Sequence, residues 1–292
     1  DMGLIGFHFT IMVQACNQYH IDPVDFIKYP YLWLDMLSRK KGSVTGCPNF
    51  GQALVIRHLK RKKPENWNLE NIKVVFNGAE PISTSIMNEF MELLAPYGFK
   101  KKAMMPVYGL AEATLAVSFS PLHEDPLITA FDRHRLQNLQ HVSEFKSNNP
   151  AALEIVSVGK AIDHCEYIIA DEHDNPLEEG KVGQVLIKGE NITTGYFEDQ
   201  EATEQVFSGP WLKTGDMGFI YEGNLYITGR YKDIIFIGGK NLYANDLEAI
   251  ACRLEGVTYG KVVIGGAFDE KKGQDQVIVF LVGSPNPNTA TT

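Results

Sequence analysis

The sequence has no excess of positive charge. Its 292 residues include 27 lysines and arginines against 36 aspartates and glutamates, which gives a formal net charge of −9. Nucleic-acid binding through phosphate contacts needs clustered basic side chains, so this balance argues against it. No apolar run reaches the roughly 20 residues of a membrane helix, and no secretory signal is visible. We therefore expect a cytoplasmic protein with no membrane span and no nucleic-acid partner.

Cysteine is also scarce. Cys16, Cys47, Cys165 and Cys252 lie far apart, and no pair has the spacing of a metal site or a redox motif. We expect four reduced and mostly buried thiols. What the sequence does have is 44% hydrophobic residues, enough to bury one sizeable core or two unequal ones.

The first half of the sequence has an α/β pattern. Leucine and tryptophan recur at helical spacing in 30–37. The β-branched run 72–76 predicts a buried strand that ends in a tight loop at Asn77 and Gly78. After Pro81, apolar residues recur at helical spacing and predict an amphipathic helix that ends near Pro96. Strand, loop and helix in this order are the unit of a parallel α/β sheet.

The second half favours β structure. Residues 121–150 are polar and read as an insertion with one short helix at 133–139. Beyond Ile155 we expect strands at 167–170 and 183–187, a turn at 171–175, a hairpin at 219–227, and strands at 262–264 and 277–282. Asn245 and Glu248 resemble a capping box that opens a helix through Leu254. The tail 283–292 is polar and is expected to be disordered.

Two short motifs have residues suited to nucleotide chemistry. In the motif 108–112, Tyr108 could stack on a base, Gly109 would let a ligand approach the backbone, and Glu112 could hold Mg²⁺. In the motif 213–216, Asp216 could accept both hydroxyls of a ribose. The simpler alternatives are a turn with a core tyrosine and a surface glutamate, and an aspartate that caps a turn.

A third motif combines charge with glycine. Residues 229–235 place charged side chains before an apolar run, and a Gly-rich loop at 238–241 and Glu248 follow. The simpler alternative is a surface strand and a β-turn. Each motif alone is weak, but three in this order rarely coincide.

In this order the motifs resemble those of the acyl-adenylate-forming superfamily, which comprises acyl-CoA synthetases, luciferases and peptide-synthetase adenylation domains. The segments 1–6, 46–50 and 108–115 are similar to the fatty acyl-AMP ligase branch, and the polar segment 121–150 lies where that branch has an insertion. The resemblance extends from Asp1 to about Val282.

The resemblance implies a role for each matching residue. Glu112 would be the catalytic Mg²⁺ ligand and Lys232 the hinge between a large domain and a small lid. The nucleotide would be bound by Asn77, Gly78, Ala79, Glu80, Pro81, Tyr108, Gly109, Asp216 and Arg230. The walls of the acyl pocket would be Asp1, Met2, Gly3, Gly6, Gly46, Pro48, Asn49 and Phe50. The lid loop would be Gly238, Gly239, Lys240 and Asn241.

The implied activity is a ligase that uses ATP and Mg²⁺. A medium or long fatty acid would attack the α-phosphate, pyrophosphate would leave, and the acyl-AMP would pass to the phosphopantetheine thiol of an acyl carrier protein. The lid would rotate between the two steps. Two alternatives stay open: an acyl-CoA synthetase, and a non-catalytic nucleotide-binding module of a larger synthase.

Two of the superfamily's features have no counterpart in this sequence. The Gly-, Ser- and Thr-rich phosphate loop would precede residue 1, and the catalytic lysine of the lid would follow residue 292. Ala111 also replaces the threonine that many superfamily members have before the glutamate, as fits the fatty acyl-AMP ligase branch. We therefore expect this chain alone to be weakly active at best.

The predicted architecture is α/β with two domains. Residues 1–229 would be part of the large domain, with a mixed sheet, helices and a β-rich subdomain. Residues 230–282 would be a truncated α+β lid.

Overall fold

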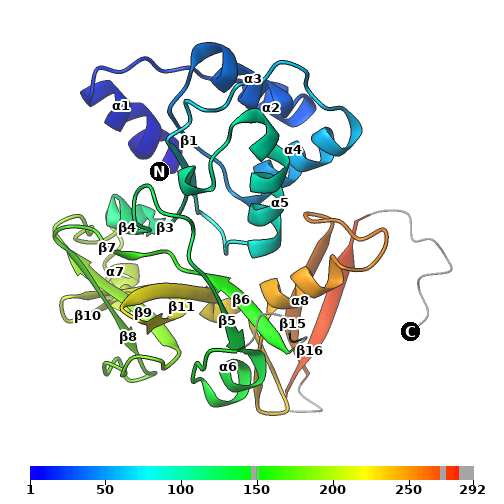
Figure 1. The fold of residues 1–292 in the computed structure, drawn as a ribbon. Helices are drawn as coiled ribbons and strands as arrows, with labels where there is room; N and C mark the ends of the chain where they lie inside the picture. Colours follow the sequence, from blue (N-terminus) through cyan, green and yellow to red (C-terminus); the bar gives the residue numbers. More distant parts are fainter. Residues whose placement is uncertain (146–148, 150, 270–273, 283–292) are drawn as a thin grey trace. The chain divides into compact units, whose positions relative to one another are not determined.

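The computed structural model describes residues 1–145, 149, 151–269 and 274–282. Two compact units, Asp1–Thr228 and Gly229–Thr292, make up the chain (Figure 1). The fold is α/β, as predicted. The predicted disordered tail 283–292, and residues 146–148 and 150 of the predicted insertion, lie outside the described residues.

The first sheet of the first unit is mixed and has the order β1-β2-β3-β4-β7. Its strands are β1 (Val44–Gly46), β2 (Val74–Asn77), β3 (Met104–Leu110), β4 (Leu115–Phe119) and β7 (Lys160–Ala161). The first three strands pair in parallel, whereas β4 pairs antiparallel to both β3 and β7. The predicted strand at 72–76 is confirmed as β2.

Helices pack around this sheet and build its core. They are α2 (Pro23–Lys28), α3 (Tyr31–Lys40), α4 (Asn49–Arg61) and α5 (Thr84–Leu94), preceded by the π-helix η1 (Met2–Phe9) and by α1 (Thr10–Val13). Short 3₁₀ turns are η2 (Ala95–Tyr97), η3 (Lys101–Ala103) and η4 (Ala111–Ala113). Helix α5 packs against α4 and buries Met87, Phe90 and Leu94. Both predicted helices are confirmed, as α3 and α5.

The second sheet is antiparallel and has the order β10-β11-β9-β8, with β12 also paired to β11. Its strands are β8 (Cys165–Ala170), β9 (Gly183–Gly189), β10 (Phe207–Ser208), β11 (Trp211–Tyr221) and β12 (Asn224–Arg230). Helix α7 (Gln200–Val206) precedes β10. The predicted strands and hairpin are confirmed. The predicted turn at 171–175 is confirmed too, because Asp171 Oδ1 accepts hydrogen bonds from the backbone of His173 and Asn175.

The predicted polar insertion has more structure than its sequence indicates. Its short helix is confirmed as α6 (Arg133–Leu139). Before it lies an unpredicted strand, β5 (Ile128–Asp132), which pairs antiparallel with β6 (Ala152–Val156). Phe131 in β5 is fully buried against the rings of Phe219 and Tyr226. A single buried aromatic therefore anchors a segment whose average composition is polar.

The described residues of the second unit form two antiparallel strand pairs and an α-helix. Its elements are η5 (Tyr231–Asp233), β13 (Ile234–Ile237), β14 (Lys240–Tyr243), α8 (Ala244–Ala251), β15 (Val262–Asp269) and β16 (Gln274–Leu281). Strand β13 pairs with β14, and β15 pairs with β16, both antiparallel. Ile235, Val262 and Ile264 form its small core. The predicted strands at 262–264 and 277–282 are confirmed as β15 and β16.

The predicted capping box is wrong. Helix α8 starts directly after β14, so Tyr243 is its N-cap and Asn245 lies in its first turn. The carboxylate of Glu248 accepts a hydrogen bond from the backbone N–H of Ile264 at 2.9 Å instead of folding back to Asn245. The helix ends at Ala251 rather than at the predicted Leu254.

The cysteines are free, but only half of the expectation about their burial is correct. Cys47 and Cys165 are buried, Cys252 is half-buried and Cys16 is exposed. Burial raises the pKa of the Cys47 thiol to about 12.

No helix in the part of the chain that the structure describes is long and apolar enough to cross a membrane.

Candidate functional site

Three predicted site segments meet at one edge of the first sheet. Segment 46–50 follows β1, loop 77–81 follows β2, and 108–112 closes β3. The register places Gly46 opposite Phe76 and Asn77 opposite Pro106. The carboxyl ends of parallel strands share an edge, which is where α/β sheets bind ligands. The parallel pairing therefore gathers residues that are more than 60 positions apart in the sequence.

Loop 77–81 has a constrained backbone. Ala79 has a positive φ of +73°, a conformation that costs energy for a residue with a Cβ and often marks functional sites. Gly78 packs so closely on the next strand that a Cβ would lie 2.8 Å from the Val107 carbonyl oxygen. The Asn77 side chain is fully buried, and neither its amide nitrogen nor its oxygen has a hydrogen-bond partner among the described residues. A buried amide without a hydrogen-bond partner is uncommon in folded proteins.

Tyr108 and Asp216 come from different sheets and are hydrogen-bonded. The Tyr108 hydroxyl donates to Asp216 Oδ2 at 2.7 Å. Asp216 lies where the register between β11 and β9 shifts, between Lys213 and Met217. Its backbone N–H donates to Thr214 Oγ1, and the Thr214 hydroxyl in turn donates to the Val185 carbonyl. The structure thus joins the first and second predicted motifs through their two candidate ligand-contacting side chains.

Glu112 is held by a residue that the sequence interpretation missed. It lies in η4, and its Oε1 accepts a hydrogen bond from the Tyr196 hydroxyl at 2.8 Å. This hydrogen bond to the carboxylate, and then partial burial, raise the pKa of Tyr196. The Glu112 backbone oxygen accepts from Thr193 N–H at 2.7 Å, and the Asn191 amide donates to the carbonyls of Ala113 in the same turn and of Ala116 in β4. The segment after β9 therefore supports the Glu112 turn.

The predicted acyl-pocket residues divide into two groups. Asp1, Met2, Gly3 and Gly6 lie at η1, which packs on β4 and β1: a Cβ on Gly6 would meet Leu115, and one on Gly46 would meet Phe7 and Met2. Pro48 is the N-cap of α4, and Phe50 is half exposed. Asn49 is 1% exposed, and both ends of its side chain bind the backbone of the 77–83 loop. Their role in an acyl pocket stays a prediction.

The remaining predicted residues belong to the second unit and are described only within it. Arg230 ends β12, and Lys232 is exposed in η5. Gly238 and Gly239, with φ of +57° and +75°, make the two-residue turn between β13 and β14. Lys240 and Asn241 begin β14. Two consecutive positive φ values are typical of a tight hairpin turn.

The described residues offer a magnesium ion a single carboxylate ligand and not a set of several protein ligands. No group of three or more His, Cys, Asp or Glu side chains among the described residues could hold a metal ion. Mg²⁺ typically takes one or two carboxylates from the protein and further oxygens from substrate phosphates. The partly exposed Glu112 carboxylate matches that mode of binding.

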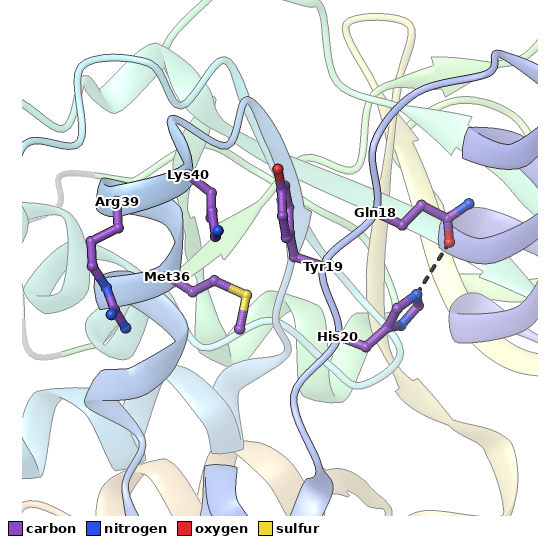
Figure 2. A pocket seen from close by; sticks show the side chains of 6 residues that line it. All are labelled: Gln18, Tyr19, His20, Met36, Arg39 and Lys40. Atoms are coloured by element: carbon purple, nitrogen blue, oxygen red, sulfur yellow. Dashed lines mark hydrogen bonds between the residues drawn. The ribbon is translucent and has the colours of Figure 1, made fainter.

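A separate hollow of about 390 Å³ contains none of the predicted residues. Figure 2 shows its lining, in which Lys40 lies over the Tyr19 ring and His20 is hydrogen-bonded to Gln18. It is lined by Gln18, Tyr19, His20, Met36, Arg39 and Lys40. Arg39 is paired with Asp35, and its side chain is 68% exposed, so this hollow is a shallow surface feature.

Comparison with known proteins places the chain in a family. The family described as AMP-binding enzyme matches residues 1–197. The chain therefore belongs to the AMP-binding enzyme family. It is 36% identical over 280 residues to the long-chain-fatty-acid–AMP ligase FadD32 of Mycolicibacterium smegmatis, an alignment that covers 85% of this chain and 43% of that protein. It is also 31% identical to the medium-chain-fatty-acid–[acyl-carrier-protein] ligase TtuA of Teredinibacter turnerae, over 87% of this chain and 42% of that protein.

A solved structure is similar over almost the whole chain. A structure from a study of fatty acyl-adenylate ligases from E. coli and L. pneumophila matches with a TM-score of 0.86 and 31% identity, covering 95% of this chain and 50% of that one. The resemblance to adenylate-forming enzymes predicted from the motifs is thereby confirmed. The chain spans about half the length of the proteins it matches, or less.

Proposed function

We propose that this chain supplies the nucleotide site and part of the acid site of a ligase that activates a fatty acid as its acyl-AMP. The observation that carries the proposal is the hydrogen bond between Tyr108 and Asp216. It joins two motifs 108 residues apart at the ligand-binding edge of a sheet, in a chain of the AMP-binding family. The names of the similar ligases support a fatty acid as the substrate.

Each residue of the first unit has a defined task in this proposal. Tyr108 stacks on the adenine, the backbone of 77–81 lies along it, and Asp216 accepts the ribose hydroxyls. Mg²⁺ supplies positive charge at the phosphates, and Glu112 offers it one oxygen. When the carboxylate of the fatty acid attacks the α-phosphate, pyrophosphate leaves, and fixed charges stabilise the charge that develops on the phosphoryl oxygens.

In this proposal the second unit takes part in the transfer of the acyl group to a thiol. In the proposal it is the beginning of a lid, in which Lys232 is the hinge residue, Arg230 a nucleotide-binding residue and 238–241 the lid loop of the thiol-transfer step. The acceptor is the phosphopantetheine arm of an acyl carrier protein, which the name of the similar TtuA ligase supports. An acyl-CoA synthetase is the alternative. The longest natural protein that carries this chain distinguishes the two when its acyl transfer is measured once with acyl carrier protein and once with coenzyme A as the acceptor.

Calorimetric titration with a non-hydrolysable acyl-sulfamoyl-adenosine tests the nucleotide site. We expect the chain to bind it and Asp216→Ala to weaken binding by about tenfold or more, because a half-buried carboxyl that accepts hydrogen bonds is lost. Asp163→Ala, at an exposed carboxylate that follows β7, is the matched control and should bind like the unsubstituted chain. Absence of binding both in the chain and in the longest natural protein that carries it would contradict the proposal.

A further inference from the structure

Four hydrogen bonds join the β1–α4 connection and the start of α4 to strand β2 and the loop that follows it. Asn49 Nδ2 donates to the Pro81 carbonyl at 2.8 Å, and Asn49 Oδ1 accepts from Ser83 N–H at 3.0 Å. The Phe50 N–H donates to Glu80 Oε1 at 3.0 Å, and the Cys47 N–H donates to the Phe76 carbonyl at 2.9 Å. These bonds join two segments that are about 30 residues apart and that have different predicted roles.

Asn49 makes the central contact. It is 1% exposed, and a buried amide is costly unless it is hydrogen-bonded. These two bonds go to backbone groups on either side of Ile82, so the side chain bridges the end of the loop and the N-terminal cap of α5. Glu80 adds a carboxylate at the N-terminus of the 13-residue helix α4, where the helix dipole favours negative charge.

The helix side of this contact is the rigid one. Gly51 lies against Cys47 so tightly that a Cβ would be 2.3 Å from its sulfur. Gln52 is fully buried, and its Nε2 donates to the Cys47 carbonyl at 2.9 Å. The loop side, in contrast, contains Ala79 at φ +73°. A strained loop keeps its conformation only where its surroundings hold it, so the helix holds the loop rather than the reverse.

We propose that Asn49 is a positioning residue: its side chain holds the loop 77–83, and the loop in turn binds the nucleotide. This inference rests on the proposed function. It gives Asn49 a task that differs from forming a wall of an acyl pocket. It also makes the turn between β1 and α4 a mechanical link, because residues 46–50 contact η1 on one side and the nucleotide loop on the other.

Binding of AMP, which has no acyl group, separates the two roles of Asn49. We expect Asn49→Ala to weaken AMP binding by about tenfold and Asn49→Asp, which keeps the acceptor but loses the donor, by about threefold. The matched control is Asn138→Ala on α6, where the amide also donates to a backbone carbonyl, that of His134, at 2.9 Å. It should bind AMP like the unsubstituted chain. Unchanged AMP affinity in Asn49→Ala would overturn the proposal.

Hydrogen–deuterium exchange tests the contact without any ligand. The amides of Ser83 and Phe50 should be protected in the unsubstituted chain, and residues 77–83 should exchange at least about tenfold faster in Asn49→Ala. Strand β9 should be unchanged and shows that the variant is folded. Unchanged exchange at 77–83 would overturn the proposal. If neither the unsubstituted chain nor the longest natural protein that carries it binds AMP, the proposed function fails, while the exchange result still decides whether Asn49 holds the loop.

Discussion

Glycine has different tasks in the two units. Gly109, in the first unit, lies so close to the following strand that a Cβ would be 1.7 Å from the Leu115 carbonyl oxygen. Gly238 and Gly239, in the second unit, have no atom within 4 Å of a built Cβ, but both have positive φ. Gly109 is required because a side chain has no room there, whereas Gly238 and Gly239 are suited to their turn because glycine readily adopts a positive φ. The candidate site of the first unit is thus set by packing, whereas the turn 238–241 is set by local dihedral angles.

The largest effect is expected from adding one carbon at Gly109. Gly109→Ala forces β3 and β4 apart and should cost about 3 kcal/mol of unfolding free energy or more. Gly239→Ala, which only strains the turn, should cost about 1 kcal/mol. Denaturant midpoints measure both, and AMP titration should show lost binding for the first variant alone. Equal denaturant midpoints for the two variants would contradict the view that packing sets the backbone at Gly109 and local dihedral angles set it at Gly239.

A smaller effect is expected at Tyr196. Tyr196→Phe removes only the hydroxyl that donates to Glu112 and should cost about 1 kcal/mol or less, because the bond is exposed to solvent. The pKa of Tyr196 is raised above 10.0, first by this hydrogen bond. The contribution is therefore fully present below pH 10.0 and is lost as pH rises through the raised pKa.

The phenolate absorbance measures this directly. Subtracting the titration of Tyr196→Phe from that of the unsubstituted chain isolates Tyr196. In Glu112→Gln the isolated pKa should fall toward 10.0, because a neutral amide destabilises the phenolate less than a carboxylate does. An unchanged midpoint would show that the Tyr196–Glu112 contact does not support the Glu112 turn.

The smallest effect is expected at Glu248 in the second unit. Partial burial, opposed by the hydrogen bond from Ile264 N–H, raises the pKa of this carboxyl above 4.5. Its contribution to stability is therefore largest below pH 4.5 and is lost as pH rises through the raised pKa. Glu248→Gln keeps an acceptor for Ile264 and should gain about 0.5 kcal/mol or less at neutral pH.

Comparing denaturant midpoints at pH 7 and pH 4 checks this sign. The gain in Glu248→Gln should shrink at the lower pH, where the glutamate is largely protonated. A gain that grows as pH falls would mean that the ionised carboxylate stabilises the unit, contrary to the raised pKa.

Local sequence patterns predicted much of the fold. The apolar runs at 167–170 and 183–187, the helical spacing around Phe90 and the turn at Glu222 and Gly223 depend on neighbours in sequence, and each is present in the structure. The strand β5 was missed because its short apolar segment, with Ala130 and Phe131 buried, lies within a stretch that is polar on average. The capping box failed because Glu248 has a partner on β15, which local spacing does not reveal.

The candidate site depended on knowledge beyond local pattern. Tyr108, Glu112 and Asp216 could be selected because their order resembles a known family. The contacts that hold them could not, because Tyr196 reaches Glu112 across 84 residues and Asn49 reaches Ser83 across 34. Such partners follow from strand order and register, which are fixed only when the chain is folded.

The register shift in β11 gives this strand two residues that its pairing with β9 does not require. Between the pairs Lys213–Leu186 and Met217–Gln184, β11 advances by four residues while β9 advances by only two. The sheet has no need of the two additional residues, and Asp216 lies within the segment that contains them. Deleting two residues there would offer the strand an uninterrupted ladder while removing the carboxylate from the place where Tyr108 meets it. A change in length at this point would therefore keep the pairing of β11 with β9 and remove the hydrogen bond between Tyr108 and Asp216.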